Sequence, residues 1–475
     1  MNEMSYSAAL AKYPAIDENY LNALLEECIR KDPSKIIVLD DDPTGVQTVH
    51  DISVFTNWKT ETIRRAFAES QKVFYVLTNS RGMTAEETTA VHYEIAQTIA
   101  MIAEESKKPY FFISRSDSTL RGHYPLETKI LREEAIKSGN APDGEILVPF
   151  FKEGGRFTID NVHYVKYDDT LVPAAETEFA KDVTFGYTHS DLPGYIEEKT
   201  CGEFKAEEVV CISLEELRKM DFDGISEKLR RTHDFGKVIV NALDYCDIKV
   251  FAIALYRTME EGKRFMFRSA AGLVKVLGGI SDRPLLTREE MIRKDTKNGG
   301  IVVVGSHTNK TTAQLNALLT LPQVEPISFH SELVLEGEKV FEKEIQRCVA
   351  SAEEVILEGR TAVCFTNRKL LKIEGDTKEE ALRRSVRISD GVQRLVAELH
   401  VEPAFVMAKG GITSSDVGIK ALRVERANVM GQICPSVPVW QTGPESRFPL
   451  TPYIIFPGNT GDENTLKEAV EILSK

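Results

Sequence analysis

The sequence predicts an α/β fold made of two domains. Apolar runs rich in β-branched and aromatic residues recur between amphipathic segments in both halves of the 475-residue chain, as is typical of buried parallel strands joined by helices. A polar stretch bracketed by glycine pairs, residues 278–300, separates the halves. A chain of this length is expected to form two or three domains, at about 150 residues each. We therefore expect domains at 1–285 and 286–475.

In the first half, strands are expected at 36–40, 73–78, 110–114 and 145–150. Residues 84–106 are expected to form a helix, because Thr84 and Glu87 have capping-box spacing and a helical apolar pattern follows. Residues 151–202 form short pieces punctuated by glycine and aspartate, which predict turns and edge strands. Strands return at 209–213 and 238–242, followed by a helical run through Arg268 and Leu277.

The second half repeats this alternation. A buried strand is expected at 301–305, then a polar loop at 306–312 and a helix at 313–321. Further strands are expected at 361–366, 403–408 and 453–457. There is no internal repeat.

Composition argues against several classes of protein. The formal net charge is −14 and no run rich in Lys or Arg stands out, so binding to nucleic acid or to an anionic membrane has little electrostatic support. The seven cysteines are scattered, with no Cys-x-x-Cys pair, which favours reduced thiols. Neither a signal peptide nor a run of about 20 apolar residues is present. We expect a soluble, cytoplasmic protein.

The first candidate site is an acidic turn. Asp40, Asp41 and Asp42 follow the strand at 36–40 and run into Pro43-Thr44-Gly45. Adjacent carboxylates repel one another, so the cluster indicates a cation, a hydroxyl-rich ligand or raised proton affinity. The alternative is a solvated turn whose aspartate caps the next helix.

Two more polar loops follow neighbouring strands. Residues 115–123 supply two arginines, an aspartate, three hydroxyls and a histidine, and residues 78–82 include Arg81. Ligands usually bind at the carboxyl ends of strands in such sheets. Hydroxyl and guanidinium groups suit a small polyhydroxy acid, whose carboxylate an arginine grips through two hydrogen bonds. Each loop alone is equally consistent with a capped loop bearing a surface ion pair.

The second half contains glycine turns after three strands. They lie at 409–416 (KGGITSSD), at 456–461 (FPGNTG) and at 305–308 (GSHT). Paired glycines let backbone N–H groups approach an anion, and a helix N-terminus favours phosphate. Together the turns outline a nucleotide site, although a glycine pair after a strand is, on its own, more often an ordinary turn.

Several alternative sites are excluded by spacing. Residues 305–312 lack the second glycine and the correctly placed lysine of a Walker A motif, and no Gly-x-Gly-x-x-Gly follows a strand. The nine histidines show no His-x-x-x-His or cysteine-rich grouping, which argues against a dedicated zinc site.

In combination, these stretches resemble the four-carbon acid sugar kinase family, formerly a domain of unknown function. The matching stretches lie at 40–52, 115–127, 151–165, 409–416, 437–443 and 456–461. The resemblance implies an N-terminal sugar-acid-binding domain, a C-terminal nucleotide-binding domain and an active site in the cleft between them. It also implies ATP-dependent phosphorylation of a terminal hydroxyl on D-erythronate, L-threonate or D-threonate, with Mg²⁺. Pro43 and Val46 depart from the commoner form of the first motif, and this branch of the family has less uniform substrates.

The resemblance and the residue chemistry suggest roles for individual side chains. Asp42, or alternatively Asp41, is expected to deprotonate the acceptor hydroxyl, with Asp416 as a rival base and Lys409 adding charge. Residues expected to bind the sugar acid are Thr44, Gln47, Arg81, Arg115, Asp117, Ser118, Arg121 and His123. Residues expected to bind ATP are Ser306, Gly410, Gly411, Ile412, Thr413, Ser414, Gly458, Asn459 and Gly461. Metal ligands are not assigned, because Mg²⁺ keeps waters and phosphate oxygens.

Other functions stay open at this point. The acceptor could be a keto or longer sugar acid, since one methylene changes pocket fit by only about 1–3 kcal/mol. A noncatalytic sugar-acid or nucleotide sensor would use the same motifs. A homodimer is a reasonable expectation from symmetry statistics alone.

Overall fold

The chain forms two compact units. The computed structural model describes residues 4–368, 371, 373, 375–458 and 460–474. The first unit comprises the residues up to Val49 together with Asn57–Asp282. The second comprises His50–Thr56 together with the residues from Arg283 onward. The expected division into 1–285 and 286–475 did not anticipate that the segment at 50–56 belongs with the second unit.

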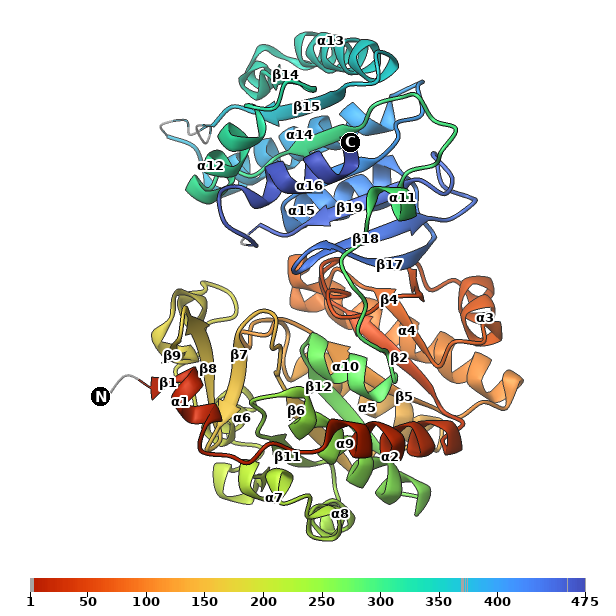
Figure 1. Ribbon diagram of the computed structural model, residues 1–475, viewed down its shortest axis with the longest axis vertical. Coiled ribbons are helices and arrows are strands. Elements are labelled where there is room, and N and C mark those ends of the chain that lie inside the picture. The colour runs from red at the N-terminus through yellow and green to blue at the C-terminus, as the bar shows by residue number, and fades with distance from the viewer. Residues whose placement is uncertain (1–3, 369–370, 372, 374, 459, 475) are drawn as a thin grey trace. The chain divides into compact units, whose positions relative to one another are not determined.

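The main sheet of the first unit has parallel strands in the order β10-β11-β6-β12-β5-β2-β4 (Figure 1). Their bounds are β2 (Lys35–Asp40), β4 (Val73–Leu77), β5 (Tyr110–Arg115), β6 (Gly144–Val148), β10 (Val210–Ile212), β11 (Gly236–Val240) and β12 (Phe265–Ser269). Every residue of β2, β4, β6 and β12 is buried. Burial on both faces explains why these strands are continuous apolar runs rather than alternating ones.

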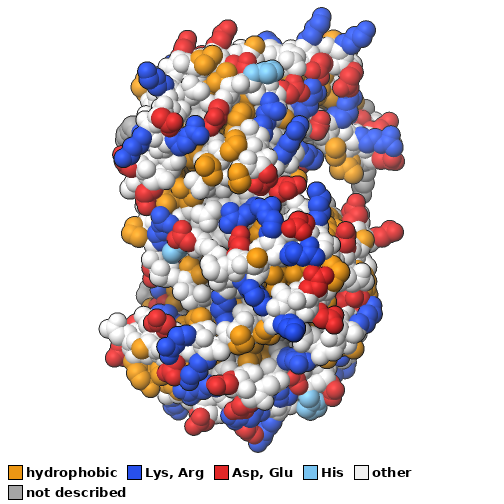
Figure 2. All heavy atoms as spheres, turned by 90° about the vertical axis from the view of Figure 1, so that its right-hand side faces the viewer, with side chains coloured by type: hydrophobic (Ala, Val, Ile, Leu, Met, Phe, Trp, Pro, Cys, Tyr) orange, Lys and Arg blue, Asp and Glu red, His pale blue; other side chains and the backbone are white. Residues whose placement is uncertain are grey.

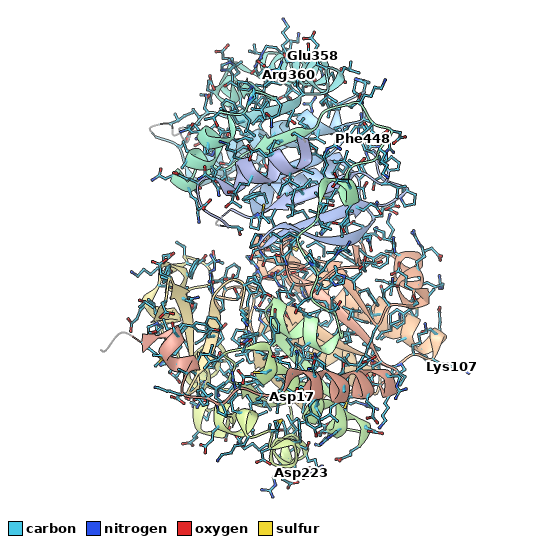
Figure 3. The ribbon with its side chains drawn as sticks, in the orientation of Figure 1. Asp17, Lys107, Asp223, Glu358, Arg360 and Phe448 are labelled. Atoms are coloured by element: carbon cyan, nitrogen blue, oxygen red, sulfur yellow. The ribbon has the colours of Figure 1, made fainter. Side chains whose placement is uncertain are left out.

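Helices cover this sheet. Helices α2 (Glu18–Lys31), α8 (Phe222–Arg231) and α10 (Ala271–Leu277) contact α9 (Tyr245–Glu260), while α3 (Thr60–Ala68) and α5 (Leu126–Lys137) contact α4 (Ala85–Ser106). Smaller elements are α1 (Tyr6–Leu10), α6 (Leu192–Lys199), α7 (Leu214–Arg218), η1 (Ser80–Gly82), η2 (Ala174–Glu176), η3 (Glu178–Lys181) and η4 (Ala206–Glu208). Asp17 caps α2, and Lys107 ends α4 in the left-handed conformation (Figure 3). The capping box of Thr84 and Glu87 is present as predicted.

The structure corrects one sequence expectation for the first unit and adds detail to another. The helical run predicted through Arg268 ends at Glu260, and Gly262, at φ 101°, leads into β12. The consecutive apolar residues Phe265, Met266 and Phe267 form a fully buried strand there instead. Residues 151–202, expected to form turns and edge strands, contribute short strands to a separate antiparallel sheet.

This small sheet has the order β1-β9-β8-β7, from β1 (Met4–Ser5), β7 (Arg156–Ile159), β8 (Val162–Tyr167) and β9 (Thr170–Pro173). Asp160 and Asn161 join β7 to β8, both with positive φ. Two such residues are what a tight hairpin with native twist requires.

The second unit contains a mixed sheet in the order β3-β17-β18-β19-β16-β13-β15-β14. Its strands are β3 (Ile52–Phe55), β13 (Ile301–Val304), β14 (Val324–Phe329), β15 (Thr361–Thr366), β16 (Val406–Lys409), β17 (Arg426–Cys434), β18 (Val437–Thr442) and β19 (Pro452–Phe456). The strands from β19 to β14 pair in parallel, and those from β3 to β19 are antiparallel. The four predicted strands are present as β13, β15, β16 and β19, whereas β14, β17 and β18 were not predicted.

The remaining helices pack around this sheet. They are α11 (Arg288–Met291), α12 (Asn309–Leu318), η5 (Ser331–Glu336), α13 (Glu338–Leu357), α14 (Lys378–Ala397), α15 (Gly411–Asp416), η6 (Val417–Ala421) and α16 (Thr465–Ser474). An apolar core that includes Val302, Met407 and Ile454 joins the sheet to α12 and α16. All seven cysteines are free thiols. Among the described residues, no helix combines the length and apolarity needed to cross a membrane.

Candidate functional site

Three polar loops of the first unit begin at one edge of its main sheet. Strands β4, β2 and β5 are adjacent and parallel, so their carboxyl ends lie together. The Thr78 N–H donates to the Asp40 carbonyl at 2.9 Å, and the Asp41 N–H donates to the Arg115 carbonyl at 3.3 Å. The loops are therefore hydrogen-bonded to one another from their first residues.

The three carboxylates of the acidic turn have different partners. Asp40 accepts from Arg115 Nη1 at 2.9 Å. Asp41 accepts from Arg81 twice, from Nη2 at 2.6 Å and from Nε at 3.1 Å. Asp42 accepts from the Thr44 N–H at 2.8 Å and Oγ1 at 2.6 Å, and from Arg81 Nη1 at 3.3 Å. The sequence singled out these carboxylates and arginines as candidate site residues, but it did not predict that Arg81 and Arg115 pair with the aspartates, and it assigned Asp40 no role.

These environments separate the acidities of the three groups. Burial raises the pKa of Asp40 to about 7, against the opposing charge of Arg115, and burial also raises the pKa of Asp41. Burial acts likewise on Asp42, but the charge of Arg81 and hydrogen bonds from Thr44 outweigh it and lower its pKa. The Asp42 side chain is 17% exposed, compared with 2% for those of Asp40 and Asp41. Asp42 is therefore an ionised carboxylate that a ligand can reach.

The loop after β5 adds a second cluster. Asp117 accepts from Arg121 Nε at 2.6 Å and from the Thr119 hydroxyl. Although burial opposes it, the charges of Arg81 and Arg121 hold the pKa of Asp117 well below its usual range. Because Arg81 also contacts Asp41 and Asp42, it connects this cluster electrostatically with the acidic turn.

Three other predicted substrate residues contact the protein itself. His163 Nε2 lies 2.8 Å from the Ser118 carbonyl, and His123 Nε2 lies 3.0 Å from the Met83 carbonyl. Gln47 is buried. The roles of these three residues toward a ligand stay predictions, and Ser118 and His123 also make hydrogen-bond contacts within the protein.

A buried ion pair beneath the loops was missed by sequence reasoning. Glu127 on α5 pairs with Arg268 on β12 and accepts from Ser80 Oγ at 2.6 Å. Burial raises the pKa of Glu127, but the charges of Arg268 and His92 bring it down to about 2. Glu127 ends the motif at 115–127 and could have been noticed, whereas Arg268 was hidden by the wrong helix assignment.

The second unit has glycine-rich turns at the carboxyl edge of its parallel strands. Strands β13, β16 and β19 are adjacent, and they lead into the turns at 305–308, at 410–411 and at Pro457 and Gly458. Gly410 has φ 111°, a conformation that side chains disfavour. A Cβ on Gly305 would lie 2.5 Å from Thr413 Oγ1. Ser306 and Thr413 both lie beside the Gly410 Cα, so this edge presents backbone and hydroxyl groups at close range.

Lys409, at the end of β16, forms hydrogen bonds with the turn that follows β19. Its buried Nζ donates to the carbonyls of Pro457 at 2.8 Å and Gly458 at 2.9 Å. Burial, followed by the charge of Lys310, lowers the pKa of Lys409 to about 7. Lys409 therefore holds the turns after β16 and β19 together through its hydrogen bonds, and its ammonium group is also a candidate to bind an anion.

The other predicted ATP residues differ in accessibility. Ile412 is 76% exposed, whereas Ser414 is buried and donates to the Ala408 carbonyl at 3.0 Å. Gly461 packs against Thr465, where no side chain would fit. Asn459 lies outside the described residues. Arg368, which sequence reasoning missed, donates to the Ser306 carbonyl at 2.6 Å.

The rival base Asp416 is already engaged. It accepts from Ser389 Oγ at 2.8 Å and pairs with Lys420 at 2.8 Å. These contacts join α15 to α14. They suit a structural role better than proton transfer.

Two further kinds of site, for a metal ion and for nucleic acid, depend on how side chains are grouped among the described residues and on the face shown in Figure 2. In the part of the chain that the structure describes, no three His, Cys, Asp or Glu side chains are grouped to hold a metal ion. On the face shown in Figure 2, Lys and Arg are intermixed with Asp and Glu. Intermixed charge of this kind does not form the continuous basic stripe typical of nucleic-acid binding.

Two protein-family models match the chain. The model described as a sugar-binding N-terminal domain matches residues 36–277, and the one described as a nucleotide-binding C-terminal domain matches residues 301–466. The first contains the acidic turn and its arginines, and the second contains the glycine turns. A comparison with curated proteins finds no match.

Solved structures share the fold. A crystal structure from Salmonella typhimurium LT2, provisionally described as a tRNA synthase, matches with a TM-score of 0.66 at 15% identity, covering 92% of this chain and 98% of that chain. The Haemophilus influenzae protein HI1011, of family DUF1537, matches with a TM-score of 0.61 at 15% identity, covering 92% of this chain and 100% of that chain. At these identities the likeness shows the fold alone.

Proposed function

Because the chain belongs to the four-carbon acid sugar kinase family, we propose that it transfers a phosphoryl group from ATP to a terminal hydroxyl of a four-carbon sugar acid. Threonate and erythronate isomers are the acceptors that we expect. The reaction would serve the catabolism of small carbohydrate acids.

One observation carries this proposal. In the unit that matches the sugar-binding model, an accessible ionised carboxylate, Asp42, lies beside the guanidinium of Arg81, at the strand ends where ligands bind in α/β sheets. Such a pair offers an acceptor for a substrate hydroxyl and a donor for an anionic group. A sugar acid carries both.

Asp42 has the position and charge needed to orient the acceptor hydroxyl. It is ionised at neutral pH, so it accepts the hydroxyl proton as the oxygen attacks phosphorus. Thr44 fixes one carboxylate oxygen and Arg81 contacts the other. Asp41, buried and held by Arg81 through two hydrogen bonds, is better suited to positioning that arginine.

The glycine turns of the second unit fit a nucleotide phosphate chain. ATP supplies the phosphoryl group, and Mg²⁺ neutralises charge on the phosphates. The first N–H groups of α15 have no acceptor within the helix, so they can donate to a phosphate. Gly410, just before the helix, has no side chain that would block a phosphate from reaching these N–H groups. Ser306 and Thr413 would add hydroxyl donors. Mg²⁺ would need few ligands from this chain, because it keeps waters and phosphate oxygens.

A coupled ADP-release assay tests the proposal. The protein would be assayed with Mg-ATP against D-erythronate, L-threonate, D-threonate and their keto and five-carbon relatives. Rapid turnover of a single four-carbon acid supports the proposal and identifies the substrate. Turnover of only a keto or longer acid would keep the kinase assignment but show that the acceptor is that acid. ATP binding without turnover of any acid favours a noncatalytic sensor, and absence of ATP binding contradicts the kinase assignment.

A further inference from the structure

Arg156 lies next to the Asp117 cluster but was not assigned a role from the sequence. It begins β7 of the small antiparallel sheet. Its guanidinium stands 5.5 Å from the ring centre of Phe179, and the Arg121 guanidinium stands 5.1 Å from the same ring. Two cations therefore share one aromatic side chain.

Arg156 differs from the other arginines of this region in having no counter-ion. Arg81, Arg115, Arg121 and Arg268 each pair with an aspartate or glutamate. Over the described residues, no carboxylate lies within 4 Å of the Arg156 guanidinium. Its Nη1 donates to the Gly154 carbonyl, and its buried Nε has no acceptor.

Burial without a counter-ion is unfavourable for a guanidinium. It lowers the pKa of Arg156, and the charge of Arg121 adds to the effect, although Asp117, Tyr167 and Glu178 oppose it. Arg156 is partly buried and stands near the Arg121 guanidinium, which pairs with Asp117 and Asp182; the loss of water and the like charge both raise the free energy of the empty site. An anion placed between the two guanidiniums would relieve both costs.

We propose that Arg156 and Arg121 together bind the carboxylate of the sugar acid. This inference rests on the proposed function, which supplies a ligand with a carboxylate at one end and the reacting hydroxyl at the other. A planar carboxylate accepts paired hydrogen bonds from guanidinium groups. With the carboxylate at Arg156, Asp117 would accept hydrogen bonds from the middle hydroxyls, and the terminal hydroxyl would point toward Asp42.

Calorimetric titration with L-threonate, D-erythronate, D-threonate and inorganic phosphate tests the assignment without requiring turnover. We expect Arg156→Gln to weaken binding of the preferred acid about 10- to 100-fold, the effect of losing a hydrogen bond between charged groups. Inorganic phosphate, which guanidiniums also bind through paired hydrogen bonds, should lose affinity in the same variant, but by a smaller factor than the acid, because it lacks the hydroxyls from which Asp117 would accept hydrogen bonds. Arg257→Gln is the matched control, because Arg257 also stacks on a phenylalanine, Phe222 at 4.8 Å, but belongs to α9 and α8 packing.

Arg156→Lys keeps the test valid if the glutamine variant fails to fold. Lysine keeps the charge but loses the two-pronged geometry, so we expect a smaller loss of acid affinity with an unchanged melting temperature. Unchanged acid affinity in the folded variants, a loss confined to phosphate, or no acid binding by the wild type would overturn the inference. If acid binding depends on Arg156 but no ADP is released, the kinase proposal fails while this one stands.

Discussion

The two polar edges of the molecule use different chemistry. In the first unit, buried carboxylates and guanidiniums neutralise one another in pairs such as Asp40 with Arg115 and Asp41 with Arg81. In the second unit, the edge consists of glycine turns and hydroxyls, and its buried cation, Lys409, binds backbone carbonyls. One edge therefore presents side chains, and the other mainly presents backbone.

This difference fits the ligands proposed for each unit. Sugar acids differ in stereochemistry and length, so a site that recognises them must depend on side chains that can vary. A phosphate chain is constant, and backbone N–H groups suffice for it. Pro43 and Val46, the departures in the first motif, accordingly lie in the unit whose ligand we expect to vary.

The largest expected effect is on kcat, and it shows which of the two edges supplies the catalytic base. Asp42→Asn should lower kcat about 10³-fold, because it removes the ionised acceptor while keeping the side-chain shape. Asp416→Asn, at an aspartate held by Ser389 and Lys420, should change kcat less than tenfold. Steady-state ADP release at saturating ATP measures both. Near-normal turnover of Asp42→Asn together with loss in Asp416→Asn would move the base to the second unit.

The packing of the acidic turn gives the next test. A Cβ on Gly45 would overlap the Asp40 carboxylate, so Gly45→Ala must displace either the turn or the Asp40–Arg115 pair. We expect a loss of about 1–3 kcal/mol in unfolding free energy, typical of overpacking. Denaturant unfolding measures it.

Gly82→Ala is the matched control, because its Cβ would meet nothing within 4 Å. It should change unfolding free energy by less than about 0.5 kcal/mol, as surface substitutions do. Equal effects of the two alanines would show that the acidic turn is loosely packed.

Much of this contrast could be predicted from the sequence. The residues that the sequence prediction missed were missed for physical reasons. The acidic turn and its arginines were found because strand-end motifs are local in sequence. Arg268 and Arg156 were not, because their importance depends on which elements are neighbours in space. The sequence of β12 was assigned to a helix, and residues 151–202 were assigned only to turns and edge strands. Asp40 was not assigned a role because its burial beside Arg115 comes from the pairing of β2 with β5.

The two edges should also respond to pH with opposite sign. Burial raises the pKa of Asp40 from 3.8 to about 7, so between these values the folded protein keeps a proton that the unfolded chain has lost. Stability from this group therefore falls as pH rises from about 4 to 7. Burial lowers the pKa of Lys409 from 10.5 to about 7, so the unfolded chain binds the extra proton and stability rises with pH above 7.

Unfolding free energies at pH 5, 7 and 9 would test both signs. Relative to Asp40→Asn, the wild type should lose stability between pH 5 and 7. Relative to Lys409→Met, it should gain stability between pH 7 and 9. Each change should be on the order of a few kcal/mol. Slopes that match those of the variants would mean that neither group titrates as its burial implies.

The smallest expected effect tests the backbone character of the second edge. Gly410→Ala places a Cβ 3.7 Å from Ser306 Cβ, an ordinary contact, so its cost comes from the backbone φ of 111° alone. We expect it to lower unfolding free energy by about 1–2 kcal/mol, the cost of holding a side chain in that region. Gly458→Ala, in the neighbouring turn, meets nothing within 4 Å and should be nearly neutral in stability. Thermal and denaturant unfolding would distinguish the two, and an equally neutral Gly410→Ala would show that this turn does not need glycine for its conformation.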